Sequence, residues 1–211
     1  MSQAVHASCA VEILSNLAMA EGKALTRQEI VDKLNTVPTF AVVNAEKQLV
    51  PIRMDAADGA DSGQDSVAFY TDASDAKGAL ELAKAQSPAD ALRLGVTPLG
   101  AAFALAQGWS TSNSACPLRL QASQMLAKEF EDTLCDQVRA MGMDPGDWQM
   151  PIFSCDDLQS PRMLPLFLSR ADLAATWVAA GRTRETVPEA VTMIDLRCLV
   201  AQMQTDGFDW R

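Results

Sequence analysis

The chain has 211 residues, of which 48% are hydrophobic and 21% charged, a composition typical of a folded soluble protein. Its net charge of −10, without clusters of lysine and arginine, argues against binding to nucleic acid or to an anionic membrane surface. No apolar run approaches the roughly 20 residues that a membrane-spanning helix needs.

The N-terminus does not have the composition of a targeting sequence. It lacks the basic start and apolar stretch of a secretory signal, and it is not rich in arginine as organelle transit peptides are. We therefore interpret the sequence as a mature form or as an incomplete chain.

The first half of the sequence predicts alternating helices and strands. Thr26 and Glu29 form a capping box that starts a short helix, and an Asp-, Gly- and Ser-rich stretch at 55–66 predicts a surface loop. The expected elements are, in chain order, helices at 5–20 and 26–34, strands at 40–43, 49–52 and 66–70, a helix at 72–86, a strand at 94–96 and a helix at 97–106.

A short strand and one long helix follow. Leu118 and Leu120 alternate with polar residues, which predicts a strand. From Ser123 onward, apolar residues recur every three or four positions as far as Met141, which is typical of an amphipathic helix. The turn sequence at 144–147 ends this helix.

The second half of the sequence repeats the pattern of the first. Three segments match in the same order: 38–40 with 151–153 at an offset of 113, 74–76 with 171–173 at an offset of 97, and 96–105 with 191–200 at an offset of 95. The 16-residue difference between the first two offsets corresponds to the acidic loop, which only the first half contains.

These matches predict an α/β (α+β) fold in which two pseudo-duplicated strand and helix units pack about an approximate two-fold axis. The expected organisation is N-terminal helices at 1–36, a first repeat unit at 37–110, a linking strand and long helix at 111–147, and a second repeat unit at 148–211.

Three segments resemble the Tic 22-kilodalton family of the chloroplast inner-envelope translocon. In residues 33–44 a short helix leads into Val37-Pro38-Thr39-Phe40 and a strand that ends in Asn44, and the blocks at 69–76 and 96–99 are similar to the next two blocks of the family. The resemblance covers residues 26–210. The acidic loop and Lys47, which replaces a glycine of the first hairpin, mark the chain as similar to a divergent member.

The resemblance implies a non-enzymatic, chaperone-like factor that binds proteins through apolar surface grooves. Its expected partners are preproteins or translocon subunits in a plastid, with the side of the membrane left open; family members also occur in relict plastids of parasites and in the cyanobacterial periplasm. The alternative from another class is a peripheral structural subunit of a photosynthetic membrane supercomplex. A chaperone would bind many segments weakly, whereas a structural subunit would bind one surface tightly.

No motif of an active site is present. The sequence lacks the nucleophile elbow, the phosphate-binding loop, the dinucleotide-binding fingerprint and the zinc-protease helix, and His6 is its only imidazole. The acidic set Asp55, Asp58, Asp61 and Asp65 does not have the spacing of a calcium-binding loop. We therefore expect no catalytic residue, no metal and no cofactor; an enzyme would require a pocket with perturbed carboxylates.

The five cysteines are widely spaced and contain no CxxC pair, so we interpret them as small buried hydrophobic residues. A pair such as Cys116 with Cys155 stays open at this point.

The residues that we predict to bind a partner are aromatic. Trp109, Trp148 and Trp210 each follow a polar or glycine-containing turn, and Phe208 lies next to the last of them. Tryptophan concentrates at binding hot spots because it buries a large area at low entropic cost. The alternative interpretation is that these side chains close the ends of the core.

Overall fold

A computed structural model describes residues 22–53, 65–88, 91–160, 163–188 and 191–210. The described residues form two compact units, the large-sheet unit (residues 26–129) and the small-sheet unit (residues 22–25 and 130–210). They contain six α-helices and both antiparallel and parallel strand pairs, so the predicted mixed α/β class is confirmed. The expected first helix at 5–20, His6, and three members of the acidic set, Asp55, Asp58 and Asp61, lie outside the described residues.

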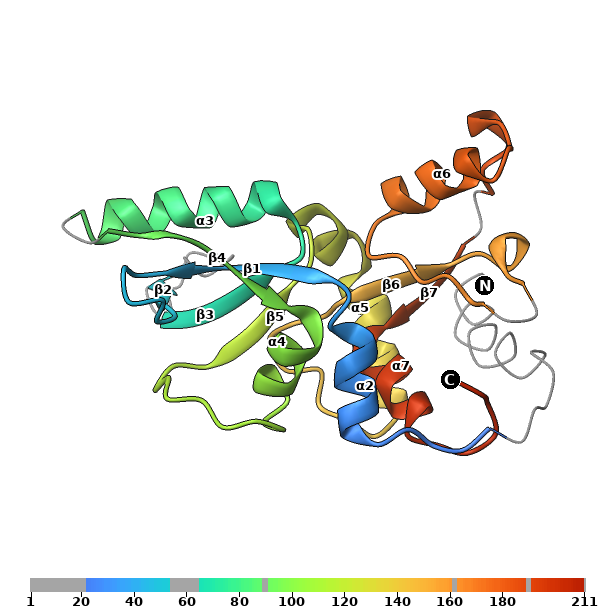
Figure 1. The fold of residues 1–211 in the computed structure, drawn as a ribbon, viewed down its shortest axis with the longest axis horizontal. Coiled ribbons are helices and arrows are strands. Elements are labelled where there is room, and N and C mark those ends of the chain that lie inside the picture. The colour runs from blue at the N-terminus through green and yellow to red at the C-terminus, as the bar shows by residue number, and fades with distance from the viewer. Residues whose placement is uncertain (1–21, 54–64, 89–90, 161–162, 189–190, 211) are drawn as a thin grey trace. The chain divides into compact units, whose positions relative to one another are not determined.

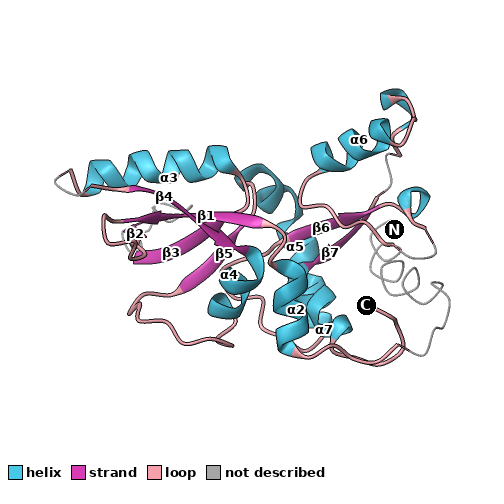
Figure 2. Cartoon of the chain, viewed as in Figure 1, coloured by secondary structure: helices cyan, strands magenta, loops and turns pink. Residues whose placement is uncertain are grey.

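The large-sheet unit is built on five strands (Figure 2). They are β1 (Pro38–Val43), β2 (Ile52–Arg53), β3 (Asp65–Tyr70), β4 (Arg93–Pro98) and β5 (Leu118–Gln121). β1 pairs with β4 over its whole length and meets β3 at Phe40 and Tyr70, while β5 runs parallel to β3. The segment 118–121, which we expected in a linker between units, is therefore a member of this sheet.

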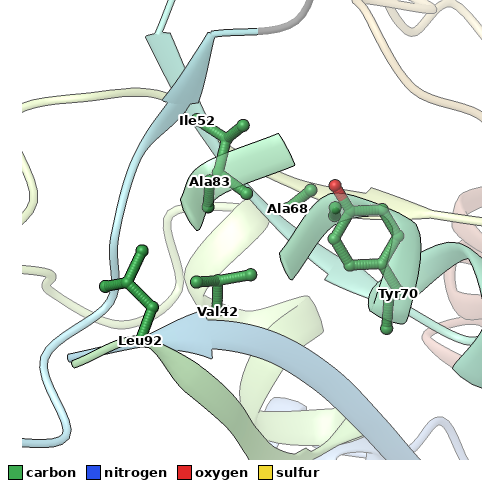
Figure 3. Close-up of a cluster of buried hydrophobic side chains, with 8 residues drawn as sticks. Val42, Ile52, Ala68, Tyr70, Ala83 and Leu92 are labelled. Atoms are coloured by element: carbon green, nitrogen blue, oxygen red, sulfur yellow. The ribbon is translucent and has the colours of Figure 1, made fainter. Parts of the chain in front are cut away.

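Helices cover both faces of the large sheet (Figure 1). On one face lies α3 (Ala73–Gln86), whose N-terminus is capped by the Asp72 carboxylate. Its buried side is made of alanines, Ala76, Ala79 and Ala83, so the helix backbone can approach the strands closely. Val42, Ile52, Ala68 and Tyr70 from the strands, together with Leu92, complete this buried cluster (Figure 3).

The other face is covered by α4 (Leu99–Ala106), and α2 (Arg27–Leu34) packs against α4. The predicted capping box is confirmed: the Glu29 carboxylate accepts from the Thr26 N–H at 2.8 Å, and the Thr26 hydroxyl accepts from the Glu29 N–H at 3.3 Å. A Cβ atom at Gly100 would overlap the Val31 carbonyl oxygen, so only glycine permits this approach of α2 and α4.

The small-sheet unit contains a two-stranded antiparallel sheet of β6 (Pro151–Ser154) and β7 (Thr192–Asp195). Two helices belong wholly to it, α6 (Arg170–Ala179) and α7 (Leu196–Met203), with 3₁₀ turns at Asp156–Leu158 and Arg184–Thr186. The long helix α5 (Gln124–Ala140) begins in the large-sheet unit and continues into the small-sheet unit.

The two units share specific local pairings, although the predicted duplication and its two-fold axis stay predictions. The Leu99 N–H donates to the Val37 carbonyl oxygen at 2.8 Å, and the Leu196 N–H donates to the Met150 carbonyl oxygen at 2.9 Å. The first members of these pairs are 97 residues apart and the second members 113 apart.

The third sequence match has an offset of 95, which differs by two residues from the spacing of the helices that follow. The helices α4 and α7 begin at Leu99 and Leu196, which are 97 residues apart.

The chain's single tyrosine, Tyr70, gives a first testable prediction. Its side chain is 1% exposed, and burial raises the pKa of its phenol above the ordinary 10.0, with Arg119 lowering it and Asp75 raising it further. A raised pKa in the folded state means that the neutral phenol stabilises the fold fully below pH 10.0 and that this contribution is lost as the pH rises through the raised pKa.

Tyrosinate absorbance of the native protein should therefore give a midpoint above 10.0. In Tyr70→Phe, the free energy of unfolding should fall less steeply at high pH than in the native sequence. A tyrosinate midpoint at or below 10.0 while the protein is still folded would contradict this burial.

Candidate functional site

An exposed apolar segment distinguishes the small-sheet unit. Residues 163–168 read Met-Leu-Pro-Leu-Phe-Leu, and none of these six side chains is buried. Met163 is 65% exposed and Leu166 is 37% exposed. We call this stretch the apolar surface segment. Six consecutive apolar residues at a surface are uncommon in a protein that has nothing to bind there.

One edge of the apolar surface segment is attached to its own unit. The N–H and carbonyl groups of Phe167 exchange hydrogen bonds of 2.9 and 2.8 Å with Phe153 of β6. Met163 exchanges bonds of 3.1 and 2.9 Å with Ser160. The backbone groups of the intervening residues Leu164 and Leu166 form no hydrogen bond with β6.

The end of the segment is fixed by an aromatic and cationic cluster. The Arg170 guanidinium lies 4.9 Å from the ring centroid of Phe130 and 5.6 Å from that of Phe153. The two rings themselves are 6.0 Å apart in an edge-to-face arrangement. The Ser169 hydroxyl caps α6 by accepting from the Asp172 N–H at 3.1 Å. The segment thus runs between two rigid elements, β6 and α6.

A buried ion pair between Asp195 and Arg197 lies where β7 ends and α7 begins. Asp195 is 0% exposed and Arg197 is 6% exposed, and their side chains meet at 3.0 Å. The Asp195 carboxylate also accepts from the backbone N–H groups of Met150 at 3.1 Å and Arg197 at 2.8 Å. Both partners are held by further hydrogen bonds, which is the condition under which a buried pair is tolerated.

The guanidinium of Arg197 also fixes the turn before β6. It donates to the carbonyl oxygens of Pro145 at 2.6 Å and Trp148 at 2.8 Å, and more distantly to that of Asp144 at 3.3 Å. Sequence reasoning missed this residue. Its only signal was an Asp-x-Arg motif in an apolar stretch, which does not indicate contacts about 50 positions away.

The edge of β7 that faces away from β6 is covered by the side chain of Gln137. The Gln137 amide donates to the Met193 carbonyl oxygen at 3.0 Å and accepts from the Asp195 N–H at 2.9 Å. A single glutamine of α5 thereby occupies the place that a further strand would take. The outer edge of the apolar surface segment has no such cover among the described residues.

The four aromatic residues predicted to bind a partner lie in different environments. Trp148 is only 7% exposed, with the Arg197 guanidinium 4.5 Å from its ring centroid, so this side chain closes the core. Trp109 is half-buried, packs edge-to-face on Phe103 at 5.2 Å and is covered by Arg27.

Phe208 and Trp210 lie together near the C-terminus, with ring centroids 4.3 Å apart, and both are partly exposed. A role of Trp109, Phe208 and Trp210 in partner binding stays a prediction.

The described cysteines are free. Cys155 and Cys198 are buried and Cys116 and Cys135 half-buried, so the pair of Cys116 and Cys155 is not formed. Burial raises the pKa of Cys198 to about 12, which keeps its thiol protonated and unreactive. Within the described part of the chain, no group of three or more His, Cys, Asp or Glu residues could hold a metal ion, and no helix is long and apolar enough to cross a membrane.

Comparison with known proteins identifies the fold. No family model matches the chain, and no curated protein sequence matches it. Solved structures do match it, among them two Tic22 proteins. The first, Anabaena Tic22 (protein transport), is 17% identical, with 85% of this chain and 87% of that chain covered and a TM-score of 0.52. The second, Tic22 from Plasmodium falciparum, is 13% identical, with 81% and 85% covered and a TM-score of 0.55.

The chain has a divergent Tic22-like fold. The resemblance suggested by the segments at 33–44, 69–76 and 96–99 is thereby confirmed at the level of fold. The Tic22-like fold extends over both units, since more than four fifths of the chain is covered.

The buried pair gives the second prediction. Arg197→Met should lower the free energy of unfolding by about 3–5 kcal/mol, because it leaves the Asp195 carboxylate buried without its cation. Arg139→Met is the matched control: Arg139 also pairs with an aspartate at 3.0 Å, Asp136, but both side chains are more than 60% exposed. This control should cost at most about 0.5 kcal/mol. Urea unfolding of both variants measures the difference, and equal losses would show that the buried network contributes little.

Proposed function

We propose that this chain is a non-enzymatic protein-binding factor of protein transport in a plastid, which holds preprotein segments through the apolar surface segment. The observation that carries the proposal is that Met163 and Leu166 are exposed, and their neighbours half-buried, in a segment that is hydrogen-bonded to β6. The Tic22-like fold supports the transport context, because one of the matched structures is described as a protein of protein transport.

The size of the segment suits weak and repeated binding. Six residues offer far less surface than the roughly 800 Å² that each partner contributes to a stable protein complex. Weak binding through apolar contacts is what a transport factor needs, since each client must be released. Binding through apolar contacts also requires no polar group placed in a special geometry.

The charge of the chain suits the same clients. With a net charge of −10, the protein attracts segments that are rich in arginine and poor in acidic residues, as transit peptides are. The attraction acts at long range and raises the rate of encounter, while the apolar residues provide the contact itself.

A third prediction concerns the surface residues. The double variant Met163→Lys and Leu166→Lys should bind an unfolded preprotein about tenfold more weakly, because each lysine removes apolar contact area. The matched control is Met125→Lys, since Met125 is 76% exposed but lies in the large-sheet unit. Fluorescence anisotropy of a labelled preprotein measures both, and equal effects of the two changes would contradict a role for the apolar surface segment.

Native purification separates this function from its main alternative. The protein is isolated at its natural level from a gently solubilised plastid fraction, and the bound proteins are identified by mass spectrometry. We expect translocon subunits and a range of preproteins at low occupancy. Photosystem or antenna subunits in fixed stoichiometry would instead make the protein a peripheral structural subunit of a photosynthetic supercomplex.

A further inference from the structure

The large-sheet unit shows how a strand can be added beside β3. The strand β5 runs parallel to β3, with Val67 opposite Leu118 and Phe69 opposite Leu120. The Val67 N–H donates to the Pro117 carbonyl oxygen at 2.9 Å, and the Thr71 N–H donates to the Gln121 carbonyl oxygen at 3.0 Å. In this arrangement Leu120 becomes completely buried.

By its offset the apolar surface segment corresponds to β3, and in the described part of the chain it is joined to β6 by a single bridge at Phe167. In the large-sheet unit Phe40 pairs with Tyr70, and in the small-sheet unit Phe153 pairs with Phe167. Phe167 follows Tyr70 by 97 residues. The caps of the helices that follow, Asp72 for α3 and Ser169 for α6, are separated by the same 97 residues.

The offset of 97 matches each residue of the segment with a residue of the large-sheet unit. Leu164, Leu166 and Leu168 correspond to Val67, Phe69 and Thr71, the residues of the large-sheet unit whose backbone groups face β5. No hydrogen bond to another described residue engages the backbone groups of these three leucines.

The proline of the segment does not interrupt this edge. Pro165 corresponds to Ala68, which belongs to the set whose backbone faces away from β5. Phe167, two residues further, directs both its backbone groups to Phe153. The missing N–H of Pro165 therefore falls on the inner side, where it costs the outer edge no donor.

We propose that the outer edge of residues 163–168 binds an extended segment of a client protein as an added parallel strand, in the position that β5 takes beside β3. The client segment alternates apolar and polar residues, as Leu118, Arg119, Leu120 and Gln121 do. This inference rests on the proposed function and specifies its binding mode: backbone hydrogen bonds hold the client, so many sequences are accepted.

Another open strand edge in the described part of the chain, that of β4, is a poorer candidate. In β4, the residues whose backbone groups face away from β1 are Leu94, Val96 and Pro98. Pro98 has no N–H to donate to an added strand. The corresponding edge in the small-sheet unit is that of β7, which Gln137 covers. No strand seated on either edge provides a template for an added one.

The experiment uses the full chain, labelled with nitrogen-15, and the synthetic peptide Pro-Leu-Arg-Leu-Gln-Ala, which has the sequence of residues 117–122. Amide exchange and chemical-shift titration locate and quantify its binding. Two further peptides are N-methylated, one at the arginine and glutamine amides, which face the protein in the proposed register, and one at the two leucine amides, which face away.

We expect the amides of Leu164, Leu166 and Leu168 to exchange more slowly when the peptide is bound. Methylation at arginine and glutamine should weaken binding about tenfold, because two backbone bonds are lost, and methylation at the leucines should not. Leu166→Pro should abolish binding by removing an outward N–H, and the matched control Pro165→Ala should bind as the native sequence does.

Three other outcomes overturn the inference in different ways. If both methylated peptides bind equally, clients bind the apolar surface segment without strand addition, and the proposed function survives. If Leu94 and Val96 become protected instead, the client binds at β4, and the proposed role of the apolar surface segment fails together with the inference. If neither the peptide nor an unfolded preprotein binds, the proposed function fails together with the inference.

Discussion

The guanidinium of Arg197 is the group on which the geometry of the small-sheet unit depends. Two strands alone, β6 and β7, make too small a sheet to be stable in water. Arg197 compensates by joining the Asp195 carboxylate at the start of α7 to the carbonyl oxygens of Pro145 and Trp148 in the turn that leads into β6. Because β6 is fixed in this way, Phe153 can hold Phe167 in register, and the apolar surface segment is presented along a rigid support.

The two units use similar local pairings to different ends. In the large-sheet unit, β3 is covered by β5 on its outer edge and by helices on both faces, and five of its six residues are buried. In the small-sheet unit the segment at the corresponding offset has no such neighbour among the described residues, and all six of its side chains retain exposure. A unit that completes its sheet gains stability, whereas one that leaves an edge open keeps a place for another chain. We interpret the large-sheet unit as structural support and the small-sheet unit as the unit that binds a client protein.

The sequence predicted what local chemistry determines. The Thr26 and Glu29 capping box, the strand after Pro38 and the helix after Asp72 depend on residues within one or two turns of each other, and each is present where expected. The short strand at 118–121 was also expected, but its partner β3 lies about 50 residues earlier, so its place in the sheet could not be inferred. Trp148 was predicted to bind a partner because it follows a turn, yet Arg197, almost 50 positions later, covers it. The apolar surface segment was missed because a run of apolar residues indicates burial as readily as binding.

Site-specific photocrosslinking tests the central claim most directly. A photoreactive amino acid replaces Met163 in one variant and Met125 in another, and both are returned to the intact organelle. Both positions are highly exposed, but only the first lies in the apolar surface segment. Our account predicts that position 163 crosslinks to apolar, extended stretches of several different preproteins, mapped by mass spectrometry, and that position 125 does not. Equal crosslinking at the two positions, or a single folded partner at position 163, would contradict it.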